Sequence, residues 1–210
     1  SLAGLIRFLI AFPVLFFMTP FILQKLGSAQ FGVWALIGVA GAVIQLSEFG
    51  MNITLIKFVA ELTAQGEDDS LNSLVSTAMV IQGLMAALLA TPIIVFRQTI
   101  VVRVLQVPTE YASLAAAVLV GSVGVYAVRI VLNVFTATLT GFQRMDISHS
   151  LSLLATMCNA IGVYISLKIG WGLAGLVIAS AGATFIFGIS AWGTVRLIFP
   201  DLHLKFRYWR

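Results

Sequence analysis

Long apolar stretches alternate with short polar breaks along the whole chain. Six stretches each contain about 20 or more mostly apolar residues, the length that an α-helix needs to cross a bilayer. They cover approximately residues 2–24, 31–59, 71–96, 110–139, 148–168 and 172–199. Because a helix satisfies its backbone hydrogen bonds internally, the pattern predicts an all-α, polytopic membrane bundle with six spans and no β-sheet.

One segment between the third and fourth stretches does not fit the pattern of a span. Residues 97–109 mix Arg97 and Arg103 with several valines and end near Pro108. This segment is too short and too charged to cross a bilayer, so we expect it to lie along the membrane interface. The tail after Pro200 is basic and aromatic, which is typical of a segment at lipid headgroups.

Composition supports the membrane assignment. Hydrophobic residues make up 60% of the chain and charged residues only 10%, with a mean hydropathy of +1.05. A soluble domain carries about 25% charged residues, and a disordered chain has far fewer apolar ones. The one cysteine, Cys158, lies in an apolar run and is interpreted as a small buried hydrophobic residue. The 12 basic residues are scattered, which argues against a nucleic-acid partner.

Basic residues give a weak signal for orientation. With a cytoplasmic N-terminus, six lie inside, at positions 57, 144, 196, 205, 207 and 210, and four lie outside, at positions 25, 97, 103 and 168. Without the three in the tail the count becomes three against four. We expect both ends to be cytoplasmic. The chain begins with Ser1 inside an apolar stretch, so we also expect it to be a fragment of a longer protein.

Three ionisable residues fall inside the predicted spans: Arg7, Glu48 and Arg129. Each costs about 2.5 to 3.5 kcal/mol to insert, and Arg129 lies nearest to the middle of its span. In one interpretation Arg7 and Glu48 extend to the inner interface, and Arg129 pairs with an acid on another helix. In the other, the two guanidinium groups line a polar cavity that attracts an anion, because their planar fork matches phosphate oxygens.

Neighbouring residues extend this candidate site. Tyr126 and Asn133 lie at i−3 and i+4 from Arg129 and share its helix face. We therefore predict a substrate site formed by Arg7, Glu48, Tyr126, Arg129 and Asn133.

Two prolines and a glycine are candidate hinges. Pro13 and Pro20 remove backbone hydrogen bonds and should bend the first span, either as part of a gate or for packing. Gly50 is the third candidate. On the sixth span Ser180, Thr184 and Gly188 recur every four residues and predict close helix packing.

Enzyme chemistry has little support in the sequence. No P-loop, GxSxG, HExxH or CxxC pattern occurs, and His149 and His203 fall in short polar segments at the membrane surface. We expect no catalytic residues, no metal and no cofactor. Transport would then depend on an H⁺ or Na⁺ gradient or on the gradient of the substrate itself.

Several short motifs occur in a characteristic order. They are FILQKLGSAQFGVW at 21–34, SEFGMNITLIKFVA at 47–60, LTGFQR at 139–144 and WGLAGL at 171–176. Together they resemble the N-terminal half of polysaccharide flippases, the Wzx-like members of the multidrug/oligosaccharidyl-lipid/polysaccharide exporter superfamily. The similarity extends over the whole chain.

The resemblance implies that residues 1–210 form the first of two six-helix lobes of a MATE-like transporter, around a cavity that opens alternately to each side of the bacterial inner membrane. It implies a cytoplasmic N-terminus and an undecaprenyl-diphosphate-linked oligosaccharide as substrate, used for surface polysaccharide such as O-antigen. The diphosphate would suit Arg7 and Arg129. Membrane lipids, and glycosyltransferases and a polymerase of the same pathway, are the implied partners.

The sequence is also compatible with functions other than a polysaccharide flippase. A cation-coupled drug or metabolite antiporter of the same superfamily would need acids within the membrane, where the sequence has Glu48. A membrane-embedded glycosyl- or acyltransferase would need an essential histidine or acid, and His149 is the candidate. A structural membrane scaffold is a further alternative.

Overall fold

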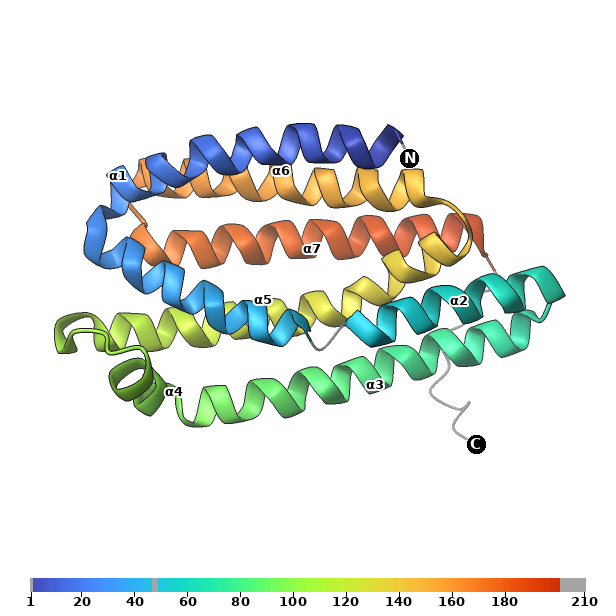
Figure 1. Ribbon diagram of the computed structural model, residues 1–210, viewed down its shortest axis with the longest axis horizontal. Helices are drawn as coiled ribbons and strands as arrows, with labels where there is room; N and C mark the ends of the chain where they lie inside the picture. The colour runs from blue at the N-terminus through green and yellow to red at the C-terminus, as the bar shows by residue number, and fades with distance from the viewer. Residues whose placement is uncertain (1, 47–48, 201–210) are drawn as a thin grey trace.

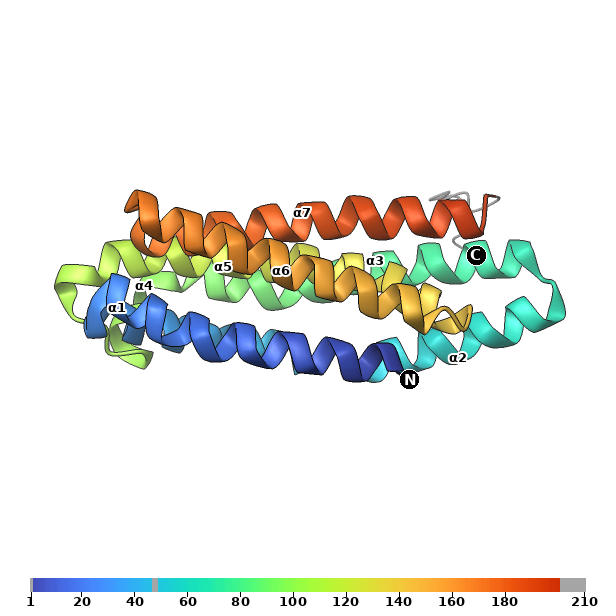
Figure 2. The same cartoon turned by 90° about the horizontal axis from the view of Figure 1, so that it is seen from above.

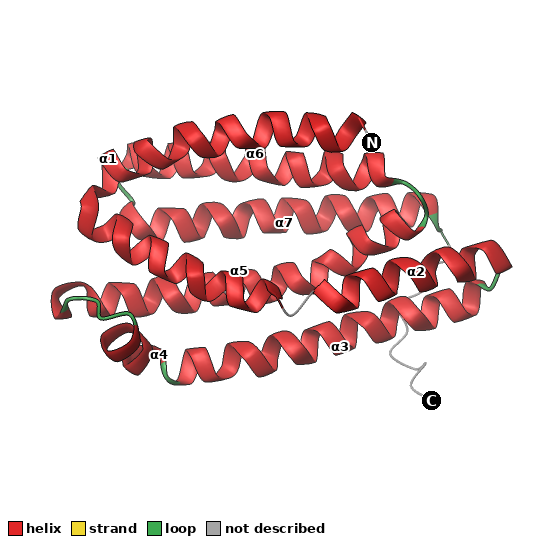
Figure 3. Ribbon diagram, in the orientation of Figure 1, coloured by secondary structure: helices red, strands yellow, loops and turns green. Residues whose placement is uncertain are grey.

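The computed structural model describes residues 2–46 and 49–200, and within these ranges every regular element is a helix (Figure 3). The long helices are α1 (Leu2–Leu46), α2 (Phe49–Gln65), α3 (Asp68–Val95), α5 (Thr109–Gly141), α6 (Met145–Ile169) and α7 (Gly172–Ile198). A short helix α4 (Arg97–Thr99) and a π-helical turn η1 (Ile100–Val104) connect α3 to α5. The all-α class predicted from the hydrophobic pattern is confirmed for the described residues.

The long helices run back and forth along the longest axis of the molecule (Figure 1). Turned by 90°, the bundle has α1 on one side and α7 on the opposite side, with α5 and α6 between them (Figure 2). The turns that follow α2 and α5 lie at one end of the bundle. The turn within α1 and those that follow η1 and α6 lie at the other end (Figure 1).

Helix α1 reverses direction at Gly27, so it consists of two helical segments (Figure 1). Gly27 has φ 76° and ψ 167°, a conformation that glycine adopts without the steric cost of a Cβ atom. The structure therefore corrects the prediction that residues 25–30, between the first two apolar stretches, form a non-helical break. The chain reverses at this single residue, and the positions on both sides of it stay helical.

Five helices of the described chain are long and apolar enough to cross a bilayer. They are Phe12–Val39, Asp68–Val95, Thr109–Gly141, Met145–Ile169 and Gly172–Ile198, judged by length and composition, and the first of them contains the reversal at Gly27. The last four agree with predicted spans to within three residues at each end. The predicted span 31–59 is not one described helix, because α1 ends at Leu46 and α2 begins at Phe49. The chain is thus a multi-pass helical membrane protein, while the count of six spans stays a prediction.

The connection between α3 and α5 folds back onto the bundle. Val101 in η1 is fully buried and Val107 is nearly so, whereas Arg97 and Arg103 are exposed. Gln106 has φ 51° and ends the helical turn before Pro108. One side of the segment therefore packs on the protein and the side with the two arginines is exposed, with Arg97 Nη1 donating a hydrogen bond to the Ile94 carbonyl at 3.2 Å. Its place along the membrane interface stays a prediction.

Buried apolar side chains form two clusters. The first includes Val123 and Ile130 of α5, and the second includes Val134 and Phe135 of the same helix. Apolar burial gives little net drive between helices in lipid, so close backbone packing at small residues matters more. At Gly188 an added Cβ would lie 2.8 Å from Leu132 Cδ1, which shows how closely α7 approaches α5. Gly188 thus has the packing role predicted from the sequence.

Candidate functional site

A small cavity with polar walls lies where α1, α5, α6 and α7 meet, with a volume of about 130 Å³. We call it the polar cleft. Its polar lining consists of Trp34 from α1, Ser122, Tyr126 and Arg129 from α5, Asn159 from α6, and Ser180 and Thr184 from α7. Val125, Val177 and Ala183 complete the wall. The four helices thus place hydroxyl, amide, indole and guanidinium groups around one space.

The α5 side of the cleft belongs to a longer polar stripe. Ser122, Tyr126, Arg129, Asn133 and Thr136 follow one another at steps of three or four residues, which puts them on one helix face. At about 1.5 Å per residue the stripe is about 21 Å long, a large part of the bilayer core. Polar groups at that depth normally face a cavity or a partner and not lipid.

Arg129 is the charged group of the cleft. Its Cζ atom lies 5.7 Å from the centre of the Phe187 ring, a cation–π contact with α7. Its side chain is exposed in the isolated chain. Within residues 2–46 and 49–200, the ion pair that forms joins Arg144 and Asp146. Arg129 therefore has no acidic partner among the described residues. The predicted alternative, a pair with Glu48, involves a residue outside the described ranges.

Tyr126 connects the cleft to α1. A Cβ atom added at Gly41 would lie within 2.6 Å of Tyr126 Cζ, so the tyrosine ring rests directly on the α1 backbone. Gly41 is buried, and any larger residue there must displace the ring or the helix. The position of Tyr126 in the cleft therefore depends on a glycine that the sequence pattern did not single out.

The far wall of the cleft is built from α6 and α7. Ser180 Oγ donates a hydrogen bond to Asn159 Oδ1 at 3.2 Å. From sequence we predicted Ser180 and Thr184 as packing residues, whereas they also line the cleft. Ser122, Asn159 and Trp34 were missed. A lone amide in the apolar stretch of α6 was the available signal for Asn159, and no comparable signal marks Trp34.

The remaining predicted binding residues are placed only in part. Asn133 lies one turn beyond Arg129 on the same helix, outside the lining of the cleft, and its carbonyl accepts a hydrogen bond from Thr136 Oγ1 at 2.8 Å. The backbone of Arg7 belongs to α1, but its side chain is outside what the structure describes, as is the whole of Glu48. A second guanidinium in the cleft therefore stays a prediction.

The candidate hinges lie in or beside α1. Pro13 and Pro20 are inside its first helical segment, whereas the residue with non-helical dihedral angles in the described helix is Gly27. Gly50 lies in the first turn of α2, where its carbonyl accepts a hydrogen bond from Thr54 Oγ1 at 2.9 Å. The sharp change of direction therefore falls at a glycine, and gating by the prolines or Gly50 stays a prediction.

A second polar contact links α2 and α3. Gln82, which is only 2% exposed, donates from Nε2 to Asn52 Oδ1 at 3.1 Å. The Gln82 Oε1 atom has no partner among the described groups. Sequence analysis missed this contact, because a single amide on each of two helices does not reveal that they face each other.

In the described part of the chain, no group of three or more His, Cys, Asp or Glu residues comes together. Comparisons with protein-family models, curated proteins and solved structures give no match. The candidate site therefore rests on its own residues.

Proposed function

We propose that the chain is one lobe of a MATE-like flippase that moves polyprenyl-diphosphate-linked oligosaccharides across the bacterial inner membrane. The motif order at 21–34, 47–60, 139–144 and 171–176 supports this family. In this proposal the two segments of α1 act as separate passes, with the second continued by α2. With α3, α5, α6 and α7 they make up the expected six spans.

The observation that carries the proposal is Arg129 in the polar cleft, near mid-span and without a described acidic partner. A cation at this depth is costly unless a cavity or an anion compensates for it. A diphosphate supplies that anion, and the guanidinium fork can hold two of its oxygens. Ser122, Asn159 and Ser180 supply further polar groups beside it.

The size of the cleft limits how much of the substrate it can hold. At about 130 Å³ it is smaller than the roughly 300 to 1,000 Å³ of typical small-ligand pockets. It can hold part of a phosphate group but not a sugar. We therefore expect the cleft to widen during transport by movement of α1 away from α5, at the contact between Gly41 and Tyr126. Bending at Pro13, Pro20 or Gly50 would accommodate this movement.

The cation-coupled antiporter gains no support from the described residues. The acids of the described chain lie near helix ends or in turns, at positions 61, 67, 68, 69, 110 and 146. A cation site at mid-membrane would need an acid there, and Glu48 lies outside the described residues. An anionic substrate is the better match to Arg129. Coupling to H⁺ or Na⁺ stays open in this proposal.

Complementation tests the proposal directly. The complete protein with Arg129→Ala, expressed in a flippase-null strain at equal membrane abundance, should restore little surface polysaccharide. Arg129→Lys should restore part of it, about tenfold less than the wild type, because lysine keeps the charge but not the bidentate fork. Arg103→Ala is the matched control, since Arg103 is exposed on η1 and outside the cleft.

Two outcomes would contradict it. If Arg129→Ala complements like the wild type, the cleft does not receive the substrate. If Glu48→Gln abolishes activity while the arginine variants retain it, the cation-coupled antiporter becomes the better interpretation.

The expected orientation has its own test. The turns after α2 and α5 lie at the same end of the bundle (Figure 1), which the proposal puts in the cytoplasm. Cysteines at Asp68 and Arg144 should therefore react with a membrane-impermeant thiol reagent in inverted vesicles but not in intact cells. Labelling from the periplasm would reverse the orientation.

A further inference from the structure

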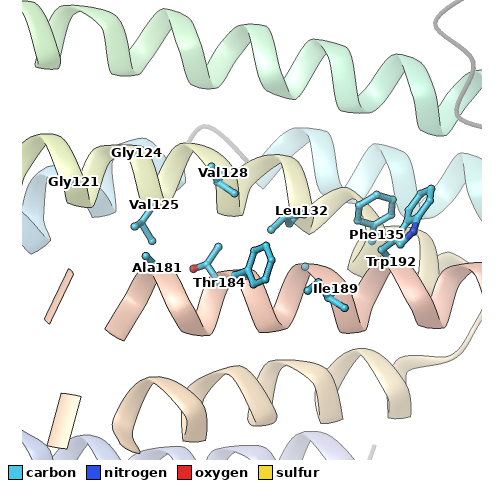
Figure 4. A pocket seen from close by; sticks show the side chains of 12 residues that line it. Gly121, Gly124, Val125, Val128, Leu132, Phe135, Ala181, Thr184, Ile189 and Trp192 are labelled. Atoms are coloured by element: carbon cyan, nitrogen blue, oxygen red, sulfur yellow. The ribbon is translucent and has the colours of Figure 1, made fainter. Parts of the chain in front are cut away.

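A second hollow lies on the other side of the contact between α5 and α7. It is an open groove of about 710 Å³, which we call the apolar groove (Figure 4). Its walls are Gly121, Gly124, Val125, Val128, Leu132 and Phe135 of α5, with Ala181, Thr184, Phe185, Gly188, Ile189 and Trp192 of α7. Val125 and Thr184 also line the polar cleft, so these two side chains separate the two spaces.

Small residues create the hollow. An added Cβ at Gly121 would lie 2.8 Å from Val177 Cγ1, so the two helices pack closely there. At Gly124 an added Cβ would meet nothing within 4 Å. The missing side chain at Gly124 thus leaves free space beside a tight helix contact. From Gly121 to Phe135 the groove follows α5 for about 21 Å, longer than half of a bilayer core of about 30 Å.

One end of the groove carries aromatic and basic groups. The Phe135 and Trp192 rings meet edge to face with centres 5.3 Å apart, and they lie together at one end of the groove (Figure 4). One helical turn further on, Arg196 places its Cζ atom 5.3 Å from the centre of the Trp192 ring. Arg196 is exposed and has no acidic partner among the described residues.

This order of groups matches a phospholipid. An apolar channel longer than half of the bilayer core suits an acyl chain, tryptophan is favoured at the depth where chain and headgroup meet, and a guanidinium binds phosphate oxygens. Basic pockets between spanning helices bind anionic headgroups. The surrounding bilayer supplies both parts of the ligand, so no further component is required.

We propose that the α5–α7 face holds an anionic phospholipid, with one acyl chain in the apolar groove and the phosphate at Arg196. The site is separate from the cleft around Arg129 and does not depend on the transported substrate. It lies in the leaflet next to the C-terminal end of α7. A lipid bound there contacts Val125 and Thr184, the wall that it shares with the cleft.

Photolabelling in vesicles tests the site. The complete protein is reconstituted with a trace of phosphatidylglycerol that carries a diazirine in its acyl chain, or with the same probe built on phosphatidylcholine. Labelled peptides are then mapped by mass spectrometry. We expect phosphatidylglycerol to label the α7 peptide with Phe185 and Ile189 about fivefold more than phosphatidylcholine does, the preference that one basic residue at an anionic headgroup provides.

Variants separate the two parts of the site. Arg196→Gln should remove the preference for phosphatidylglycerol, and Arg196→Lys should restore most of it. Gly124→Leu should fill the groove and lower labelling by both probes. Gly182→Leu is the matched control, because Gly182 has equally open surroundings on α7 but does not line the groove. Its labelling should equal that of the wild type.

Equal labelling by the two probes would overturn the proposal, and so would a preference for phosphatidylglycerol that persists in Arg196→Gln. Either result would mean that the groove contacts bulk lipid without selecting an anionic headgroup. Labelling unchanged in Gly124→Leu would overturn it as well. The readout is lipid contact and not transport, so loss of the flippase assignment would leave this result intact.

Discussion

Helices α5 and α7 present opposite chemistry on two adjoining faces. On one face Ser122, Tyr126 and Arg129 line the polar cleft, and on the other Gly124 and Val128 line the apolar groove. A shift of one or two residues along α5 changes the surroundings from guanidinium and hydroxyl groups to hydrocarbon. Because lipid can satisfy no hydrogen bond, the polar face must turn inward and the apolar face can turn to the bilayer.

The comparison separates two uses of small residues. Gly41 lets Tyr126, which lines the polar cleft, lie directly on α1. A Cβ atom added at Gly124 would meet nothing within 4 Å, so this glycine leaves space in the apolar groove. Gly41 is required for a close helix contact, and Gly124 is required for the free space in the groove. Substitutions at the two positions should therefore behave differently.

The largest expected effect comes from moving a charge to the wrong face. Ile189→Arg places a guanidinium on the groove side of α7 and should lower membrane insertion by about 2.5 to 3.5 kcal/mol. The measurement is the amount of folded protein in the membrane, with Ile189→Leu as control. Equal abundance of the Arg and Leu variants would mean that the groove faces water or protein and not lipid.

The reverse change should have the opposite effect on stability. Arg129→Leu removes a charge from the middle of a span, so the midpoint of thermal unfolding in detergent should stay equal or rise while surface polysaccharide is lost. A fall in thermal stability without loss of complementation would make Arg129 a structural residue.

A smaller effect is expected where Tyr126 packs against α1. Gly41→Ala forces a methyl group against the Tyr126 ring and should lower the free energy of unfolding by about 1 to 3 kcal/mol. Gly38→Ala on the same helix is the control, since a Cβ there meets nothing within 4 Å. Adding Tyr126→Leu to Gly41→Ala should recover part of the loss. Equal stability of the two alanine variants would exclude close contact at Gly41.

The smallest expected effect concerns the hydrogen bond between Ser180 and Asn159 in the cleft wall. A double-mutant cycle with Ser180→Ala and Asn159→Ala should give a coupling of about 0.6 kcal/mol, the average for bonds between spanning helices. Thermal or denaturant unfolding in mixed micelles would measure it. A coupling above about 2 kcal/mol would exceed the range known for such bonds and would indicate a wider network.

Much of the helix layout follows from the sequence alone. Apolar stretches of bilayer length, ended by polar residues near Gly66, Gly141 and Gly170, fix where α3, α5, α6 and α7 begin and end to within three residues. This is local information, because the cost of a charge or an open backbone in lipid acts on each residue separately. The same reasoning placed Tyr126, Arg129 and Asn133 on one face of α5.

Tertiary structure decided which faces meet. Trp34 and Asn159 lie more than a hundred residues apart in the chain, yet both line the cleft with Arg129. Trp34 and Asn159 line the cleft because of the way α1, α6 and α7 pack around α5. The spacing of residues within one helix does not determine this packing. The reversal at Gly27 and the contact of Gly41 with Tyr126 depend on the same packing. The sequence therefore determined the helices and the charged face of α5, while the three-dimensional packing of small residues decided that this face borders a cleft and its neighbour a groove.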